Sequence, residues 1–459
     1  MSKSTRRLWI IGSIILATGV VGLIVVLDGE ERPNGYRPRM RQVGAVANWW
    51  DPVPADLKAV AVETDARSNI ARADYIGSGA CSACHVKQSQ AWSEHPHRWM
   101  NARAEALTVK GDFTGDASVS YMGGTASFFL DDSAFRMKLE RGDVARTYAI
   151  TQTIGSRFYQ YYVGHLLEGP ESAGHSSYSV DHVLPFGYWL DRKEWVPTVH
   201  VHWAKLDGQN VDEEDLPFDK RHDPFALPHD LFSFTPYTLC NQCHTTMPLG
   251  DLLVRNPDVL GRHAPLELHL AASSYLVETH PELELSASEV SDNQLQDVMK
   301  KAMAWDARDH AVNLGISCEA CHLGARDHAE GNLKRPRFFP QSPHLYALTA
   351  DGATQHETGR SHDNLNWACG RCHTGGRRLL AGGMATWNST EYTDAMRGSC
   401  YTKLKCIDCH SPHEAIGKKW QLNPIEDDAL CLKYQTEEGS ELKRIEQFNL
   451  NIMSAMASP

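Results

Sequence analysis

Five copies of the pentapeptide Cys-x-x-Cys-His are the part of this sequence that most clearly carries chemistry. They contain ten of the 12 cysteines: Cys81 and Cys84, Cys240 and Cys243, Cys318 and Cys321, Cys369 and Cys372, and Cys406 and Cys409. This pattern is typical of covalent attachment of a c-type haem. Two thiols on one helical turn can reach the two vinyl groups on one edge of a porphyrin, and the next residue then lies under the iron.

Other uses of paired cysteines fit the pattern less well. A structural zinc site needs two cysteine pairs at short separation, and zinc gives no reason for a histidine after every second cysteine. A thioredoxin-like motif would occur once, and five disulfides closing two-residue loops would be strained. We therefore predict five covalently attached c-type haems, whose proximal iron ligands are His85, His244, His322, His373 and His410.

The neighbourhoods of three motifs resemble those of the multihaem c-type cytochromes, in particular the cytochrome c-552/554-like family. The segment from Ile76 to His97 is similar to that family's first haem segment, and Cys318 to His328 is similar to its Cys-Glu-Ala-Cys-His block. Cys406 to His413 is similar to its Cys-x-x-Cys-His-x-x-His block. The resemblance covers residues 77–415 and implies electron transfer through haems that mostly have two histidine ligands.

Histidines outside the motifs are the candidates for distal iron ligands. His328 and His413 lie too close to their own motifs to reach the far face of that haem, so we expect them to ligate an adjacent one. His97 is favoured by the family resemblance, with His95 and Met100 as competitors. Four further histidines are weaker candidates: His200, His202, His182 and His362. Each of them could instead be a surface residue or a hydrogen-bonded core residue.

Two cysteines lie outside the five motifs. Cys431 begins a segment with the frame of a sixth motif, but Tyr434 and Gln435 replace its second cysteine and its histidine. We therefore expect no haem there. Cys400 and Cys431 could pair in an oxidising compartment, or they could be two unrelated buried thiols.

The N-terminus predicts a membrane anchor. Lys3, Arg6 and Arg7 precede the uncharged apolar run Leu8–Leu27, and about 20 such residues suffice to cross a bilayer as a helix. The following sequence offers no small-residue cleavage site, so an uncleaved anchor is favoured over a removed signal peptide. The basic residues before the run predict a single-pass protein of the cell inner membrane with its body in the periplasm.

The elements expected around the motifs divide the chain into five parts. These are an N-terminal anchor (1–33), a periplasmic tether (34–75), a first haem segment with a β-rich insertion (76–235), a four-haem domain (236–420) and a C-terminal tail (421–459). Short β-prone runs at 126–130, 134–139 and 146–151 predict the insertion. Helices are predicted over 88–106, 292–313 and 436–448. The expected fold class is a multihaem cytochrome fold, mainly short α-helices and loops around stacked c-haems.

Composition and motifs together predict an electron carrier. The chain has 459 residues and a net charge of −12, which argues against a nucleic-acid partner. We expect electrons to pass between redox partner proteins, or from the quinol pool, along the bound haems. The alternative is a multihaem oxidoreductase in which one iron keeps an open position for a small nitrogen or sulfur compound. The acidic body favours a partner with a basic docking patch.

Overall fold

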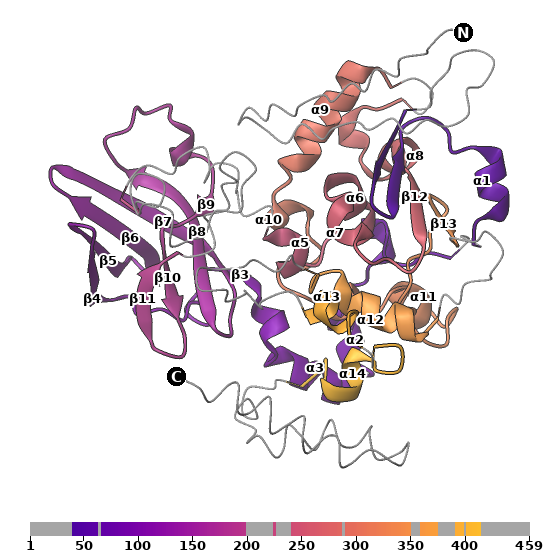
Figure 1. Ribbon diagram of the computed structural model, residues 1–459. Coiled ribbons are helices and arrows are strands. Elements are labelled where there is room, and N and C mark those ends of the chain that lie inside the picture. Colours follow the sequence, from indigo (N-terminus) through magenta and orange to yellow (C-terminus); the bar gives the residue numbers. More distant parts are fainter. Residues whose placement is uncertain are drawn as a thin grey trace, which may run out of the picture.

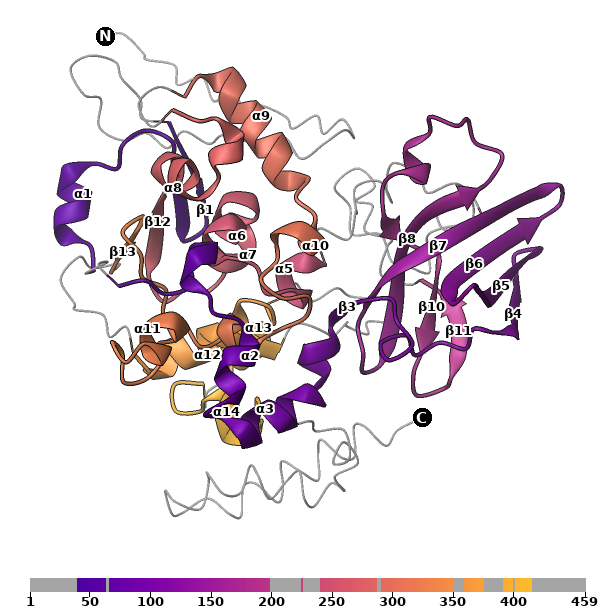
Figure 2. The same ribbon diagram turned by 180° about the vertical axis from the view of Figure 1, so that it is seen from behind.

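The computed structural model describes residues 39–62, 66–198, 224–225, 240–286, 290–349, 359–374, 391–398 and 401–414. Two β-sheets and a set of short helices make up this part of the chain (Figure 1). The larger sheet has nine strands and the smaller has four. Figures 1 and 2 show the larger sheet on one side of the molecule, and the smaller sheet among the helices on the other.

The nine-stranded sheet is antiparallel, and most of its neighbouring strands also follow each other in the chain. Its strands are β3 (Asn101–Arg103), β4 (Thr114–Tyr121), β5 (Gly124–Asp131), β6 (Ala134–Arg141), β7 (Val144–Ile154), β8 (Tyr159–Glu168), β9 (His182–Val183), β10 (Phe186–Trp189) and β11 (Glu194–Pro197). Asp132 and Ser133 join β5 to β6 with φ angles of 47° and 70°. Such left-handed pairs match the twist of the two strands that they connect.

Aromatic side chains fill the concave face of this sheet. Buried residues alternate with partly exposed ones along β5 and β6, as expected for strands with one face toward a core. The sheet curls so far that its end strands, β4 and β11, contact each other. Trp195 of β11 stacks on Phe128 of β5 with 3.5 Å between ring centroids. The sheet therefore nearly closes around its own core.

The four-stranded sheet joins the start of the described chain to segments more than 200 residues later. Its order is β1 (Met40–Val43), β2 (Val46–Trp49), β12 (Glu267–Ala271) and β13 (Leu345–Leu348), and β2 runs parallel to β12. Val46 and Ala47 are fully buried. The segment expected to be a tether therefore contributes strands to the core.

The helices are short. They are α1 (Ala55–Val60), α2 (Ser78–Ser82), α3 (Val86–Ser93), α5 (Asn241–His244), α6 (Leu249–Arg255), α7 (Pro257–Gly261), α8 (Ala272–Thr279), α9 (Asp292–Met303), α10 (Ala307–His310), α11 (Ala325–Ala329), α12 (His362–Gly370), α13 (Glu391–Ala395) and α14 (Cys406–Cys409). The 3-10 helices are η1 (Arg72–Asp74), η2 (Pro96–Trp99), η3 (Ser176–Tyr178), η4 (Pro281–Leu283) and η5 (Cys318–Ala320). Both views place α2, α3, α11, α12, α13 and α14 together at one end of the molecule (Figures 1 and 2).

The expected fold class is wrong. The largest element is a nearly closed antiparallel sheet, and its strand β7 has 11 residues, about as many as the longest described helix, α9, with 12. A mainly helical fold around stacked haems does not describe such a molecule. The helix predicted over 88–106 ends with α3, and β3 then pairs with β7. The helix predicted over 292–313 is broken between α9 and α10.

No helix in the described ranges is long and apolar enough to cross a membrane. For these ranges, this finding contradicts the expected transmembrane helix and the inner-membrane and periplasmic location that depended on it. Residues 1–33, to which the anchor was assigned, lie outside the described residues. The same holds for the tail 421–459 with its predicted helix, and for His200, His202, Cys400 and Cys431.

Candidate functional site

Each of the five motifs folds into the same single helical turn. In every copy, the backbone N–H of the histidine donates to the carbonyl of the first cysteine, at 2.9–3.1 Å. The turns belong to α2, α5, η5, α12 and α14 or follow them directly. An i to i+4 hydrogen bond places both cysteines and the histidine on one turn of chain. This is the local geometry that attachment of a haem through two thiols requires.

The motifs lie next to one another, in an order that differs from their order in the chain. The thiols of Cys81 and Cys318 lie close enough to shift each other's pKa, which places the first motif beside the third. Cys243 and Cys372 join the second motif to the fourth in the same way. Cys369 and Cys406 join the fourth to the fifth. The fourth motif therefore has neighbours on both sides.

Three motif histidines face a histidine from another segment. The ring centroids of His85 and His328 are 6.2 Å apart. Those of His97 and His373 are 6.3 Å apart, and those of His322 and His413 are 5.9 Å apart. Two imidazoles bound to opposite sides of one metal ion through bonds of about 2.0–2.1 Å would have centroids roughly 6 Å apart. The residues present therefore fit irons with two histidine ligands.

Hydrogen bonds at Nδ1 orient three of the histidines. The Nδ1 atom of His328 lies 2.9 Å from the Leu333 carbonyl oxygen. The Nδ1 atom of His244 lies 3.4 Å from the Met100 carbonyl oxygen, and that of His373 lies 3.0 Å from Glu391 Oε2. Metal-bound histidines commonly donate their second ring N–H to such acceptors. Among the described residues, no hydrogen bond engages Nε2 of these three rings, which leaves that atom available to iron.

Burial keeps several of these rings neutral. It lowers the pKa of His97 to about 3 and those of His244 and His322 to about 4. His373 differs, because the hydrogen bond with Glu391 raises its pKa. A neutral imidazole has the free lone pair that a metal ligand needs. His97, His244 and His322 therefore have this form at neutral pH.

The remaining distal candidates have other surroundings. His95 uses Nδ1 to accept the backbone N–H of His97. Both ring nitrogens of His362 are engaged, Nδ1 with Asp363 and Nε2 with the Tyr401 and Leu404 carbonyls. His182 lies in β9, where Nδ1 contacts the Val180 carbonyl and the buried Nε2 has no hydrogen-bond partner among the described residues. His362 thus lacks a free nitrogen for iron.

A metal centre made of protein side chains alone is not found in the described part of the chain. No group of three or more His, Cys, Asp or Glu residues there is arranged to hold a metal ion. This corrects the expectation of a metal-binding site in that sense. A haem iron takes four ligands from the porphyrin, so it needs only one or two protein ligands. The paired histidines satisfy that smaller requirement.

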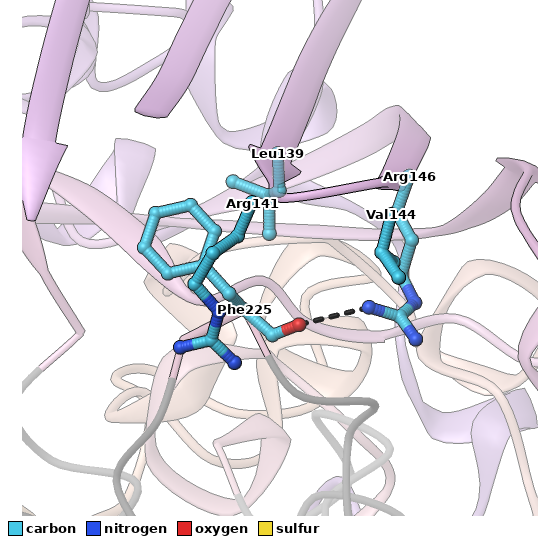
Figure 3. Close-up of a pocket in the computed structure, with 5 residues that line it drawn as sticks. All are labelled: Leu139, Arg141, Val144, Arg146 and Phe225. Atoms are coloured by element: carbon cyan, nitrogen blue, oxygen red, sulfur yellow. Dashed lines mark hydrogen bonds between the residues drawn. The ribbon is translucent and has the colours of Figure 1, made fainter. Parts of the chain in front are cut away.

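A hollow on the nine-stranded sheet has a volume of about 190 Å³. Figure 3 shows its lining residues, Leu139, Arg141, Val144, Arg146 and Phe225. Arg146 donates to the Phe225 carbonyl and pairs with Glu171. The lining contains neither cysteine nor histidine. This hollow is therefore separate from the motif cluster.

Sequence reasoning missed the residues that connect the motifs. Glu319 and Arg371 occupy the x positions of the third and fourth motifs and are buried. Asn241, in the second motif, accepts a hydrogen bond from Asn101 Nδ2 at 2.8 Å. The sequence does show charged and amide side chains at the x positions of the Cys-x-x-Cys-His motifs, and these could have indicated residues that connect one motif to another. Their burial depends on which motif lies opposite, and the linear pattern does not contain that information.

The chain was compared with family models, curated proteins and solved structures, and no match was found in any of the three comparisons.

Proposed function

We propose that this protein binds five c-type haems covalently and transfers electrons one at a time. The observation that carries the proposal is the set of three facing histidine pairs, His85 with His328, His97 with His373, and His322 with His413. Each pair joins the histidine of one motif to a histidine from another segment. Two strong-field imidazoles per iron favour low-spin haem, which exchanges electrons without binding a substrate.

Different residues of the chain would hold different parts of each haem. The motif cysteines would supply the thiols for covalent attachment, and the facing histidines would supply the nitrogens that bind the iron. Leu333, Met100 and Glu391 fix the ring orientations through Nδ1. When bound, the haem iron supplies reversible one-electron exchange. Contacts between cysteines of different motifs support transfer from one site to the next.

The resemblance to cytochromes of the c-552/554-like group remains a prediction, and it points to the same function. The partners that we propose are one-electron carrier proteins. A substrate-converting oxidoreductase would need an iron with an open axial position. The facing pairs at three of the five motifs favour the carrier over that alternative.

Intact mass and spectra of the ferric protein test the proposal. We expect a mass increase of five haems that survives denaturation, and low-spin signals in electron paramagnetic resonance. The variant with Cys81→Ser and Cys84→Ser should lose one haem, whereas the control Cys400→Ser should keep all five. A protein without bound haem contradicts the proposal. A high-spin signal that changes with added cyanide or nitrite would favour the oxidoreductase instead.

A further inference from the structure

Two oppositely charged side chains are buried inside neighbouring motifs. Glu319, in the third motif, is 0% exposed, and Arg371, in the fourth motif, is 4% exposed. Charged side chains are rarely buried to this extent, because removal from water is costly. Each must therefore be stabilised by specific partners, and each remains a fixed charge close to the thiols of its own motif.

Glu319 is held as a carboxylate between the third motif and the first. Its oxygens accept the backbone N–H groups of Ile76 and Gly77 at 2.9 and 2.8 Å and the side-chain amide of Asn69 at 3.2 Å. Burial raises the pKa of Glu319, while these three N–H donors and Arg326 oppose the rise. Hydrogen bonds from N–H donors favour the ionised form. The segment that they anchor leads directly into the first motif.

Arg371 connects the fourth motif to the third. One of its terminal nitrogens donates to the carbonyl of Ala320, which lies between the two cysteines of the third motif. The guanidinium also lies 5.2 Å from the centre of the Trp367 ring. An arginine keeps its positive charge in proteins at all ordinary pH values. The contact therefore places a permanent cation at the junction of these motifs.

The two charges act on different thiols. The negative charge of Glu319 acts on Cys81 and Cys318 of the first and third motifs. The positive charge of Arg371 acts on three other thiols, those of Cys321, Cys369 and Cys372. The junction of the first and third motifs is thus negative, and that of the third and fourth is positive.

Three arginines that act on groups in or beside the motifs are more exposed than Arg371. The side chains of Arg326 and Arg262 are 41% and 40% exposed, and Arg360 is also exposed. Water and salt screen exposed charges much more than buried ones. A buried cation favours the reduced form of a nearby iron, which carries one positive charge fewer, and a buried anion favours the oxidised form. Glu319 and Arg371 should therefore dominate the local field.

We propose that Glu319 and Arg371 set the direction of electron flow, from the junction of the first and third motifs toward the fourth motif. This inference rests on the proposed function. Each event moves one electron, so one ferrous iron becomes ferric at the donor side and one ferric iron becomes ferrous at the acceptor side. No atom or proton is transferred. A one-electron donor protein of lower potential supplies the electron, and a one-electron acceptor protein of higher potential removes it.

Spectroelectrochemical titration of the full-length, haem-loaded protein tests the assignment. Glu319→Gln should raise the potential of a subset of the haems, and Arg371→Gln should lower that of another subset. We expect each change to alter the ratio of reduced to oxidised haem at fixed potential by about tenfold, which corresponds to about 59 mV for a one-electron couple. Glu319→Asp and Arg371→Lys keep the charge, and should stay near the parent potentials.

Further variants separate charge from structure. Glu330 is an exposed carboxylate that pairs with Arg326, so Glu330→Gln should leave all potentials unchanged. If the Arg371→Gln variant does not bind its haems, the titration of the Glu319→Gln variant alone tests the proposed direction of electron flow. Unmoved potentials, or shifts of the same sign in both variants, would overturn the direction assigned here. The intact mass distinguishes failure of the proposed function from failure of this inference. Loss of all haem contradicts the proposed function, whereas five bound haems with unmoved potentials contradict this inference alone.

Discussion

His328 combines three features of an iron ligand within one short segment. It follows the third motif, its Nδ1 contacts the Leu333 carbonyl, and its ring faces His85 of the first motif. The first and third motifs are joined again through Cys81 and Cys318. Two independent contacts thus place this histidine beside a motif that is not its own.

Replacing His328 by Ala should open one axial position. The protein should keep five covalent haems, because the thiols are unchanged, while one ferric iron becomes high-spin and binds cyanide. Electron paramagnetic resonance and a cyanide titration measure this change.

His344→Ala provides the matched control. His344 is a partly buried histidine that contacts Glu278 and Ser274 instead of a motif, so its loss should leave the spin state unchanged. An unaltered spin state in the His328 variant would remove His328 from the set of iron ligands.

His280 predicts a pH-dependent contribution to stability. Its Nε2 and Nδ1 atoms each lie 2.8 Å from a carboxylate oxygen, of Asp251 and Glu282, and its ring stacks on Trp305. Although burial opposes protonation, these carboxylates raise the pKa of His280. His280 therefore stabilises the fold fully below its unfolded pKa of about 6.5, and this stabilisation is lost as the pH rises through the higher folded value.

The variant His280→Gln measures this contribution. Its loss of unfolding free energy relative to the parent should be largest near pH 5.5 and should shrink toward pH 8.5. Urea unfolding at both values gives the difference. A deficit that grew with pH would contradict the assignment.

At the scale of elements, Asp181 links the nine-stranded sheet to the helices. Its buried carboxylate contacts His165 Nδ1 of β8 at 2.6 Å, Thr151 Oγ1 of β7 at 2.7 Å and the Arg308 guanidinium of α10 at 2.8 Å. These contacts hold two strands and one helix through a single side chain.

Asp181→Ala would remove a buried carboxylate and leave three partly buried donors without their acceptor. We expect a loss of about 3 kcal/mol in unfolding free energy, typical of breaking a buried charge pair. Asp131→Ala serves as the control, because its carboxylate is 60% exposed and pairs with Arg136 on the surface, where about 0–1 kcal/mol is normal. Equal losses in the two variants would show that the link is weak.

Three of the nine strands of the larger sheet could be predicted, and the architecture could not. Alternating β-prone runs at 126–130, 134–139 and 146–151 coincide with β5, β6 and β7, because hairpins are specified by local pattern and turn residues. The strands β1, β2, β12 and β13 pair across long separations. No local pattern records that pairing. The segment 88–106 was expected to stay helical, but Pro96 begins η2 and β3 then pairs with β7.

The candidate site, too, could be predicted from the sequence only in part. The five Cys-x-x-Cys-His motifs can be recognised in the sequence, because five residues of fixed spacing define each of them. His97, His328 and His413 were named as distal candidates, but which motif each one faces depends on how distant segments pack. His182 and His362 were the less strongly indicated candidates. The structure gives them other surroundings, one in β9 and the other hydrogen-bonded at both ring nitrogens.

At the scale of the whole molecule, the net charge of −12 predicts how the protein meets its partners. Electron transfer with a basic carrier protein should slow several-fold between about 0.01 M and 0.15 M salt, as the screening length falls from about 30 Å to about 8 Å. Stopped-flow mixing with a basic single-haem cytochrome measures the rates.

An acidic carrier of similar potential provides the comparison. Its rate should stay constant or increase over the same salt range, because screening reduces repulsion. If both carriers responded alike, the acidic surface would have no part in docking.

The parallel pairing of β2 with β12 also has a consequence for how the chain reaches its final form. Val46 cannot find its partner Leu268 until more than 200 further residues are available, and such distant contacts form slowly. The first motif lies between β2 and β12 in the sequence, and its neighbour Cys318 follows β12, so this motif also packs only after most of the chain has been made. A late-closing sheet therefore leaves an interval in which the proposed haem attachment at Cys81 and Cys84 would take place on an open chain. Speeding its closure should lower the yield of fully loaded protein.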